Sequence, residues 1–557
     1  MKIKTHKKFI LFFIVILFTI NSLTHTSIGL NPDYSGSKTN LKINSISEGY
    51  GLTVSIKNEG DNNAKDIVLS IKSSGGLLFI PKKNYKIPHL SSHDSLDIHI
   101  KMFGIGLGIL TDCPKIKLEL NSPNSNTIHE IITSRIFGSY VKILGRFYND
   151  KDSFEGYTLF TPEYSSKTYL IDNTGDIINT WKSNHLQGFA VYLLKNGDMV
   201  RSDLPYINPT FIAGGVSGCV EKFNWYGDLI WDFKYSNEKV CLHHDVEILP
   251  NGNILMIAWE YKTRLEAIQA GRNPRLIPEG RLWPDHIIEV EPNGSNEGNI
   301  VWEWHVWDHL IQDFDTRKNN YGVVEDHPEL IDINYIKKGA IRADWNHINS
   351  IDYNEEYDQI LLSSKNFNEI WVIDHSTTTE EAAGHTGGRY GRGGDILYRW
   401  GNPQAYDAGT PEDQKFFGQH DAQWIESGCP GEGNILVFNN GQGRYTGLYS
   451  SVDEIKPPVD DYGNYDLIAG FSYGPTEIEW SYKAKNPTTF YSDHLSGAQR
   501  LPNGNTIICN GANGIIFEIN PEKDIVWKYT NLYPDPSNNN VFTVRRYPQN
   551  YPGIIEI

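Results

Sequence analysis

Cysteine is scarce in this chain. Its 557 residues include five cysteines, none in a CxxC pair or in the Cys/His spacing of a metal-binding motif: Cys113, Cys219, Cys241, Cys429 and Cys509. Zinc sites of the usual kind need such spacing, so we expect no metal. In an oxidising compartment, Cys219 and Cys241 are a candidate pair across one hairpin.

Clusters of positive charge are also missing. The chain carries 50 Lys and Arg against 68 Asp and Glu, a net charge of −18, and its pI is near 5.5. A nucleic-acid-binding surface needs clustered Lys and Arg, so we expect no nucleic-acid partner. We interpret the acidity as a contribution to solubility.

Long hydrophobic runs are absent except for one short run near the N-terminus. Four lysines within residues 2–8 precede the apolar run "FILFFIVILFTI" at 9–20, and the small residues "SIG" follow at 27–29. The run is shorter than the ~20 residues of a typical membrane span. Residues 1–29 are therefore expected to be a signal peptide or an uncleaved N-terminal anchor that tethers the protein to a membrane. Either one places the body of the protein outside the cytoplasm, in the periplasm, secreted or anchored facing outward.

Aromatic residues and glycine, in contrast, are abundant. Aromatics make up 12% of the chain, with 14 Trp and 31 Tyr, and there are 50 glycines. Together with short alternating segments this composition predicts an all-β protein. Residues 36–135 alternate apolar and polar positions with period two, as in "LTVSIKNEGDNNAKDIVLSIKSSGG" at 52–76. They are expected to form a small immunoglobulin-like β-sandwich domain.

A repeated motif begins near residue 148. A turn, two apolar residues and an aromatic residue, usually Trp, recur at 175–181, 227–233, 298–304, 394–400, 476–482 and 523–529. A second motif, an Asn-Gly turn between apolar runs, recurs at 193–200, 248–256 and 500–508, with a longer variant at 428–437. Such turns indicate hairpins, and irregular repeats of several short strands are typical of β-propellers. The copies predict a six-bladed β-propeller over residues 148–557.

Polar residues share one equivalent position ahead of these hairpin turns: His244, His347, His420 and Ser496. Equivalent positions of a propeller are related by rotation about its axis, so we expect a ring of side chains at one mouth of the central channel. Lys365 and Asn349 are expected to face the same cavity. Three histidines can hold zinc or copper, whereas a lysine disfavours a metal and favours a tetrahedral anion.

Strand alternation bears on the neighbours of these histidines. Adjacent residues of a strand point to opposite faces. Asp245 and Asp421 are therefore expected to bond the backbone or an adjacent blade and not the histidine beside them. The same rule lets only one of His243 and His244 face inward, and the repeat alignment favours His244.

Several ordered segments together resemble the bacterial and archaeal aryl sulfotransferases. They are "HHDVEILPNGN" at 243–253, "DWNHINSIDYN" at 344–354, "LLSSKNFNEIWVIDHSTTTEEAAGHTGG" at 361–388, "GQHDAQWI" at 418–425, "LVFNNG" at 436–441 and "SGAQRLPNGNTIICNG" at 496–511. The resemblance covers about residues 150–535. It implies a six-bladed propeller with a small N-terminal β domain that transfers sulfate without a nucleotide donor, a metal or another cofactor.

The resemblance also implies roles for single residues. His420 is expected to be transiently sulfated, and His244, His347, Asn349 and position 365 to bind the sulfuryl group. Position 365 is Lys here and Arg in the family, so the charge stays but the planar, bidentate guanidinium fork is lost. Further candidates for substrate binding are His243, Ser496 and Arg500, although Arg500 also suits a role in bracing its hairpin.

The implied reaction is a ping-pong transfer from a phenolic sulfate donor to a phenolic acceptor through sulfohistidine. Cationic neighbours are expected to lower the pKa of His420 below its usual ~6.5, keeping it nucleophilic. A secreted propeller that only binds a ligand or protein, an aryl sulfate hydrolase and a metal-binding propeller remain alternatives. A homodimer is left open.

Overall fold

The computed structural model describes residues 39–108, 113–123, 125–336, 341–467 and 470–554. Its regular secondary structure is mainly antiparallel strands, and the described residues contain two short α-helices, α1 (Arg264–Gln269) and α2 (Thr379–Ala382). The predicted all-β fold is confirmed. The expected leader, residues 1–29, lies outside the described residues; among those described, no helix has the length and apolarity that crossing a membrane requires.

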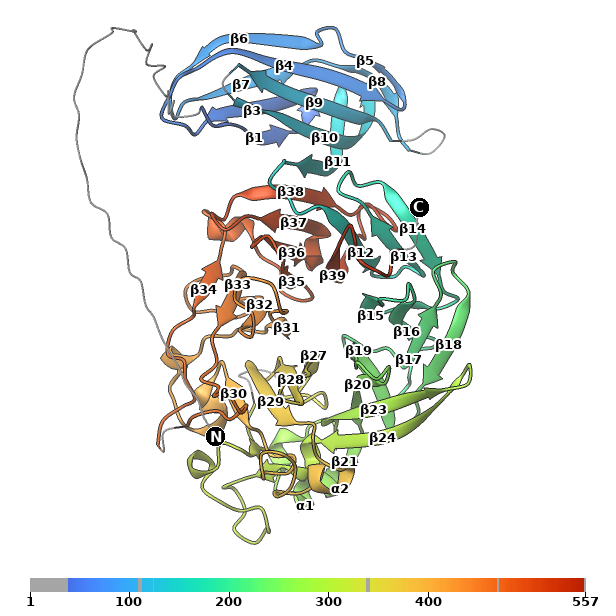
Figure 1. The fold of residues 1–557 in the computed structure, drawn as a ribbon, viewed down its shortest axis with the longest axis vertical. Helices are drawn as coiled ribbons and strands as arrows, with labels where there is room; N and C mark the ends of the chain where they lie inside the picture. The colour runs from blue at the N-terminus through green and yellow to red at the C-terminus, as the bar shows by residue number, and fades with distance from the viewer. Residues whose placement is uncertain (1–38, 109–112, 124, 337–340, 468–469, 555–557) are drawn as a thin grey trace, which may run out of the picture.

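A β-sandwich of two layers occupies one end of the molecule (Figure 1). One sheet contains β1 (Leu41–Ser47), β3 (Leu52–Asn58) and β7 (Ser95–Ile100). The facing sheet contains β4 (Ala64–Ser74), β6 (Asn84–Leu90), β9 (Lys115–Ser122), β10 (Ser125–Gly138) and β11 (Tyr140–Asn149), with β2 (Gly49–Tyr50), β5 (Leu77–Phe79) and β8 (Phe103–Gly106) at its edges. Alternate residues such as Leu52, Val54 and Ile56 are fully buried between the layers. Strands β10 and β11 run past the expected boundary at residue 135, and β11 pairs with β38 of the larger domain.

The larger domain is a ring of four-stranded antiparallel sheets around a common centre (Figure 1). In chain order, the first sheet contains β12 (Gly156–Pro162), β13 (Lys167–Ile171), β14 (Ile177–Lys182) and β39 (Val541–Pro548), and the second contains β15 (Leu186–Leu193), β16 (Met199–Leu204), β17 (Cys219–Phe223) and β18 (Leu229–Lys234). The third contains β19 (Val240–Ile248), β20 (Ile254–Glu260), β23 (Asp285–Asn293) and β24 (Glu297–His305), and the fourth contains β27 (Ile348–Asn354), β28 (Gln359–Ser364), β29 (Glu369–Asp374) and β30 (Tyr398–Trp400). The fifth contains β31 (His420–Trp424), β32 (Ile435–Asn439), β33 (Ser451–Ile455) and β34 (Trp480–Tyr482), and the last contains β35 (Gly497–Arg500), β36 (Thr506–Asn510), β37 (Ile515–Ile519) and β38 (Ile525–Thr530). The two-stranded pairs β21 (Lys262–Thr263) with β22 (Arg281–Leu282) and β25 (Leu310–Ile311) with β26 (Ile331–Asp332) lie in connecting segments. Because β39 joins the sheet that begins with β12, the two ends of the ring close within one sheet.

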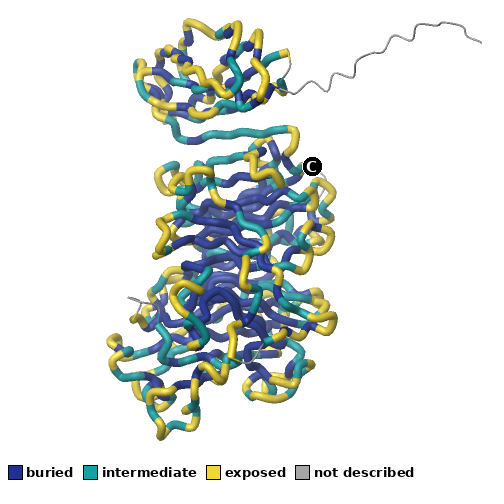
Figure 2. Tube along the Cα trace, turned by 90° about the vertical axis from the view of Figure 1, so that its left-hand side faces the viewer, coloured by how far each residue is buried: buried dark blue, intermediate teal, exposed yellow. Residues whose placement is uncertain are grey.

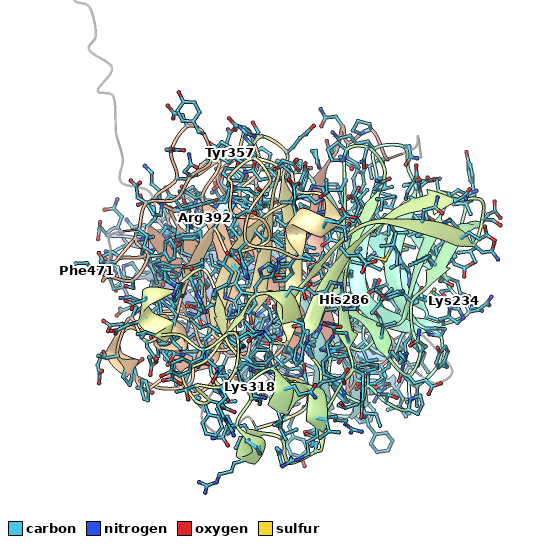
Figure 3. All side chains as sticks on the ribbon, turned by 90° about the horizontal axis from the view of Figure 1, so that it is seen from below. Lys234, His286, Lys318, Tyr357, Arg392 and Phe471 are labelled. Atoms are coloured by element: carbon cyan, nitrogen blue, oxygen red, sulfur yellow. The ribbon has the colours of Figure 1, made fainter. Side chains whose placement is uncertain are left out.

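Burial follows this arrangement. The strands of the ring are buried and the exposed residues gather in the connecting loops (Figure 2). Seen from below, the exposed Lys234 and Phe471 lie at opposite edges, with the fully buried His286 between them (Figure 3). Side chains on the innermost strands are therefore packed against protein atoms and shielded from solvent.

The repeated Trp motif joins neighbouring sheets. It falls on the outer strands, and its buried indoles donate from Nε1 to a backbone carbonyl of the next sheet: Trp181 to Asn224 at 2.9 Å, Trp231 to Glu297 at 2.9 Å, Trp304 to Gly394 at 2.7 Å, Trp400 to Pro475 at 2.8 Å and Trp527 to Asn173 at 3.1 Å. In β34 the corresponding Trp480 instead lies under the cations of Arg500 and Lys523 from the following sheet. The Trp motif that revealed the repeat thus stabilises the contact between neighbouring sheets, because an indole buries a large apolar area while its N–H donates to an acceptor.

The suggested cysteine pair is wrong. Cys219 begins β17, whereas Cys241 lies in β19 of the neighbouring sheet, so the two do not share a hairpin. Both thiols are buried and free; Cys429 and Cys509 are also buried and free, and Cys113 is free and partly exposed.

Candidate active site

The inner strands share an irregularity that the sequence did not reveal. The pairing register shifts between Leu242 and Val246 in β19, between Ile348 and Ile351 in β27, and between His420 and Gln423 in β31. Left-handed backbone conformations accompany these bulges, with φ of +55° at His244, +55° at His347 and +53° at Asp421. Such conformations cost about 1–3 kcal/mol at a residue other than glycine and concentrate at functional sites. The bulges reorient side chains at the same place on three neighbouring sheets.

The bulge in β19 overturns the alternation argument for the two adjacent histidines. His243 and His244 are both fully buried, and their Nδ1 atoms lie 2.8 Å apart. Nε2 of His243 lies 3.1 Å from Oδ1 of Asp285, whose Oδ2 accepts from the backbone N–H of Ile348 at 2.7 Å. His243 therefore sits between Asp285 and His244. The two rings do not point to opposite faces, because a register shift suspends strand alternation, and His244 is the one that contacts His347 and Phe542.

The charge states of Asp285 and His243 follow from their burial. Burial raises the pKa of Asp285 well above its usual value and lowers the pKa of His243 to about 3. One of the two facing Nδ1 atoms of His243 and His244 donates to the other, whereas Nε2 of His243 approaches Oδ1 of Asp285 without the geometry of a hydrogen bond.

His347 lies directly against His244. Their ring centroids are 4.6 Å apart, and Nδ1 of His347 lies 2.5 Å from Oδ2 of Asp344. The other oxygen of Asp344 accepts from Nε1 of Trp259 at 3.1 Å, which fixes the carboxylate. Hydrogen bonding and charge from His347 hold the pKa of Asp344 below its usual value despite burial. An ionised Asp344 orients His347 and stabilises its imidazolium form, as in other carboxylate–histidine pairs.

Lys365 lies beside His347. Its backbone N–H donates to the carbonyl of His347 at 3.2 Å, and the residue is half-buried. Burial lowers the pKa of Lys365, while the charge of Asp344 opposes that shift. Lys365 thus supplies a positive charge at the edge of the histidine cluster.

His420 is held in a single tautomer by Asn440. Its Nδ1 lies 2.7 Å from Oδ1 of Asn440 and 3.1 Å from the carbonyl of Gly418. The amide nitrogen of Asn440 donates to the carbonyls of Ser492 at 2.8 Å and Leu495 at 3.0 Å, so its Oδ1 must face His420. Because both neighbours of Nδ1 are acceptors, Nδ1 carries the proton and Nε2 carries the lone pair. Asn440 lies in the segment "FNNG", but its role could not be derived from the sequence.

Burial keeps His420 neutral. It lowers the pKa of His420 well below the usual value, with the charge of Lys365 as the next cause. The direction agrees with the sequence expectation, but neighbouring cations come second. The same environment lowers the pKa of His244 and His347.

Two phenylalanines complete the cluster. The ring of Phe542 lies 6.0 Å from His244 and 6.4 Å from His420, and Phe189 packs edge-on to it at 5.3 Å. Phe542 comes from β39, beyond the repeats and the recognised segments, so the sequence held no signal for it. These rings provide apolar surface beside the histidines.

The remaining predicted residues lie in different places. Asn349 donates to the carbonyl of Gln419 at 2.8 Å and so supports the strand that carries His420. Ser496 is fully buried, donates to Oγ of Ser492 at 2.8 Å and accepts from the N–H of Gly511 at 3.0 Å. Arg500, by contrast, pairs with Glu454 at 2.8 Å and lies over Trp480, so the structure does not bring it to the histidines. Its contacts are those of a residue that braces the hairpin.

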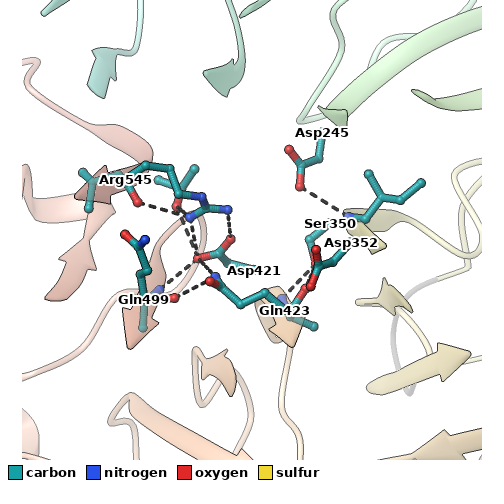
Figure 4. Close-up of polar contacts among 12 residues, drawn as sticks. Asp245, Ser350, Asp352, Asp421, Gln423, Gln499 and Arg545 are labelled. Atoms are coloured by element: carbon teal, nitrogen blue, oxygen red, sulfur yellow. Dashed lines mark hydrogen bonds and ion pairs between the residues drawn. The ribbon is translucent and has the colours of Figure 1, made fainter. Parts of the chain in front are cut away.

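The aspartates that follow the histidines bond to other sheets, as alternation suggested. Asp245 accepts from the hydroxyl of Tyr192 at 2.8 Å. Asp421 pairs with Arg545 at 2.8 Å (Figure 4) and accepts from the N–H of Ala498 at 2.9 Å. Both line a cavity of about 660 Å³, together with Glu247 and other carboxyl groups. Acidic side chains thus gather beside the cationic and neutral cluster.

This acidic cavity predicts a pH dependence of stability. Burial raises the pKa of Asp245 from 3.8 to about 7, against the opposing charge of Arg545. Between these two values the folded protein binds more protons than the unfolded chain, so stability falls as pH rises through this window. We expect the urea unfolding midpoint to decrease from pH 5 to pH 8, and Asp245→Asn to flatten that decrease. Equal slopes for the two proteins would contradict this assignment.

A glycine sets the position of His244. The carbonyl of Gly215 accepts from the N–H of His244 at 2.7 Å, and a Cβ at Gly215 would lie 1.8 Å from the imidazole. Its φ of +88° also disfavours a side chain. Gly215→Ala is therefore expected to displace His244, with a stability loss of about 1–3 kcal/mol and at least a tenfold fall in activity. The matched control is Gly214→Ala, where a Cβ meets nothing within 4 Å, and both are compared by urea unfolding and steady-state kinetics. Equal behaviour of the two variants would show that Gly215 does not position the ring.

The fold and the site define an all-β, propeller-like protein whose inner strands present a buried group of histidines beside a lysine. Residues 147–534 match the family described as Arylsulfotransferase (ASST). The chain belongs to the arylsulfotransferase family, as the sequence resemblance predicted, and this membership supports a sulfotransferase activity.

Solved structures add only a general likeness. A protein of unknown function from Bacteroides caccae shares 13% identity, with a TM-score of 0.37 over 71% of this chain and 99% of its own. An inactive virginiamycin B lyase from Staphylococcus aureus with quinupristin shares 10% (TM-score 0.31, 73% and 88%), and apo AztD from Citrobacter koseri shares 8% (TM-score 0.32, 71% and 98%). None of the curated proteins compared with the chain matches it. No functional argument rests on these structures.

Proposed function

We propose that this protein transfers a sulfuryl group from a phenolic sulfate ester to a phenol through a sulfated His420. The observation that carries the proposal is the fixed tautomer of His420, whose Nε2 lone pair is free while Nδ1 is bonded to Asn440 at 2.7 Å. A neutral imidazole with a directed lone pair is a competent nucleophile. The neighbouring His244, His347 and Lys365 are the donors that a sulfuryl group requires.

In the first half-reaction Nε2 of His420 attacks sulfur. The N–S bond forms as the bond between sulfur and the aryl oxygen breaks, and the phenolate leaves with that electron pair. The anionic sulfate ester favours the protonated form of the neighbouring His347, which takes a proton from solvent as the donor binds. His347 then gives this proton to the phenolate and becomes neutral, while His420 keeps its proton at Nδ1. Charge spreads over the sulfuryl oxygens in a loose transition state, by analogy with phosphoryl transfer. The N–H of His244 and the ammonium of Lys365 stabilise that charge.

The second half-reaction reverses these steps with a new phenol. Neutral His347 takes the phenolic proton as the oxygen attacks sulfur, the N–S bond breaks, and the electron pair returns to Nε2 of His420. His347 is protonated at the end of this step, with Asp344 stabilising its charge, and it returns the proton to solvent as the product leaves. The phenylalanines at positions 189 and 542 offer apolar surface to the aryl ring.

The test uses 4-nitrophenyl sulfate with and without added phenol. Nitrophenol release that depends on phenol, with phenyl sulfate as the second product, supports transfer. Release without an acceptor assigns an aryl sulfate hydrolase instead. No release, and no gain of one SO₃ group by intact-mass analysis with donor alone, overturns the enzymatic proposal and leaves a ligand-binding protein.

Replacement of Lys365 tests the departure from the family pattern. Removing a positioned cation from a developing anion costs about 10²–10³ in rate, so Lys365→Ala is expected to lower kcat/KM by that factor. Lys365→Arg keeps the charge and restores the guanidinium fork, and is expected to keep or raise activity. Steady-state kinetics on 4-nitrophenyl sulfate decide between them. An equal loss in both variants would show that Lys365 acts through packing and not through charge.

A further inference from the structure

A second group of titratable side chains lies in the β15–β18 sheet, apart from the proposed active site. Asp203 in β16 is fully buried, Glu221 in β17 is 2% exposed, and His185 precedes β15. One ligand atom from each of these three residues lies within 4.8 Å of the other two. Asp203 and Glu221 share a face of the sheet, because Glu221 pairs with Arg201, two residues before Asp203.

One oxygen of each carboxyl group and one imidazole nitrogen face this group without a donor from the rest of the described chain. Among the described residues, no hydrogen bond of acceptable geometry reaches Oδ2 of Asp203, Oε2 of Glu221 or Nδ1 of His185, and all three atoms are buried. His185 Nδ1 approaches Oε1 of Glu221 at 2.9 Å without the geometry of a hydrogen bond. Asp203 and Glu221 lie close enough to share a proton, so the buried carboxyl groups need either a proton or a metal cation between them.

Arg201 does not fill this place. Its Nε donates to Oδ1 of Asp203 at 2.8 Å, and its Nη2 donates to the same oxygen. Nη1 is directed instead to Oγ1 of Thr168 at 3.2 Å. The guanidinium thus neutralises one carboxylate from the far side and leaves Oδ2 turned toward Glu221.

We propose that His185, Asp203 and Glu221 bind a divalent transition-metal ion such as Zn²⁺. One imidazole nitrogen and two carboxylate oxygens form a donor set that such ions accept. Ligand atoms around tetrahedral zinc lie about 3.4 Å from one another, so small side-chain movements complete the site. The His185 side chain is 25% exposed, which gives the ion a route from solvent and leaves a position for water.

A second cluster, His309 with His385 and Asp395, provides the comparison. Nε2 of His309 lies 2.8 Å from the carbonyl of Ala382, and Nδ1 of both histidines lies within 2.8 Å of Asp395. Both ring nitrogens of His309 and Nδ1 of His385 already have protein partners, so the arrangement of this cluster does not call for a metal. It therefore serves as a control for adventitious binding by histidines.

Metal binding should displace a proton. Burial raises the pKa of Asp203 well above its usual value, while hydrogen bonds hold that of Glu221 lower. Without the ion, a proton on Asp203 takes the place between the two carboxyl groups, with Arg201 and His185 as the neighbouring charged or titratable groups. Zn²⁺ then competes with that proton, so affinity rises with pH.

The experiment is zinc titration of the chelator-treated full chain by calorimetry, with metal content after dialysis as a second measurement. We expect one Zn²⁺ per chain, a raised Tm with zinc, and proton release that makes the heat depend on the buffer. His185→Ala and Glu221→Gln should each lose the zinc while His385→Ala keeps it; circular dichroism confirms that each variant folds. No retained zinc in the wild type, zinc retained equally by all variants, or zinc lost only in His385→Ala overturns the proposal. None of these readouts depends on sulfuryl transfer.

Discussion

Replacing His420 with alanine is expected to abolish sulfuryl transfer. His420 is the one residue that forms a bond to sulfur in the proposed reaction, through the Nε2 lone pair that its bond to Asn440 leaves free. Loss of a catalytic nucleophile lowers kcat by roughly 10⁴-fold or more in enzymes of this kind of mechanism. The variant should release no nitrophenol above background from 4-nitrophenyl sulfate, and its mass should stay unchanged after incubation with donor.

The control for this prediction is a histidine outside the cluster. His327→Ala removes an exposed side chain that pairs with Glu329 at 2.9 Å, and it should leave both kcat and the sulfated mass unchanged. Transfer that persists in His420→Ala at a tenth of the wild-type rate or more would show that another group carries the sulfuryl. His347 would then be the first candidate, because its ring lies next to His244 and an aspartate supports it.

The general fold was predictable because its signals are local. Period-two alternation and Asn-Gly turns mark strands and hairpins wherever they occur, and the Trp motif repeats because every outer strand needs the same fastening to the next sheet. The end of the N-terminal sandwich was harder to predict. Strand β11 belongs to both domains because it pairs with β38. Its partner lies about 380 residues later in the chain, and no local sequence pattern predicts such a pairing.

The site was predictable in its residue types and not in its geometry. Repeat alignment singled out His244, His347 and His420, which the structure gathers into one cluster: His347 lies against His244 and Lys365, and Phe542 contacts His244 and His420. Strand alternation then misled, because the bulge at His244 brings the ring of His243 beside it. Asp344 is only three residues from His347, yet no sequence pattern showed that its carboxylate turns back to the imidazole. Asn440, 20 residues from His420, reaches it from the end of the paired strand, which is visible only once the strands are in place.

Replacing Asp421 with alanine is expected to lower the free energy of unfolding. Asp421 is 3% exposed and pairs with Arg545 through both carboxylate oxygens, at 2.8 and 3.2 Å, while its Oδ2 also accepts from Ala498 at 2.9 Å. These bonds join strands β31, β35 and β39 from three sheets. Asp421→Ala leaves the Arg545 guanidinium buried without its counter-charge, which costs about 3–5 kcal/mol. The urea unfolding midpoint should fall accordingly.

A double variant separates the pair from the charge. In Asp421→Ala/Arg545→Met no unpaired charge remains, and a hydrophobic side chain of similar length fills the space of the guanidinium. The double variant is therefore expected to be more stable than Asp421→Ala alone, because most of the single-variant loss is the cost of an unpaired buried cation and not the net value of the ion pair. Equal midpoints for the single and double variants would assign the loss to the hydrogen bond from Ala498 instead. Since Asp421 directly follows His420, nitrophenol release by the double variant also shows whether this buried pair must hold the bulge that orients the nucleophile.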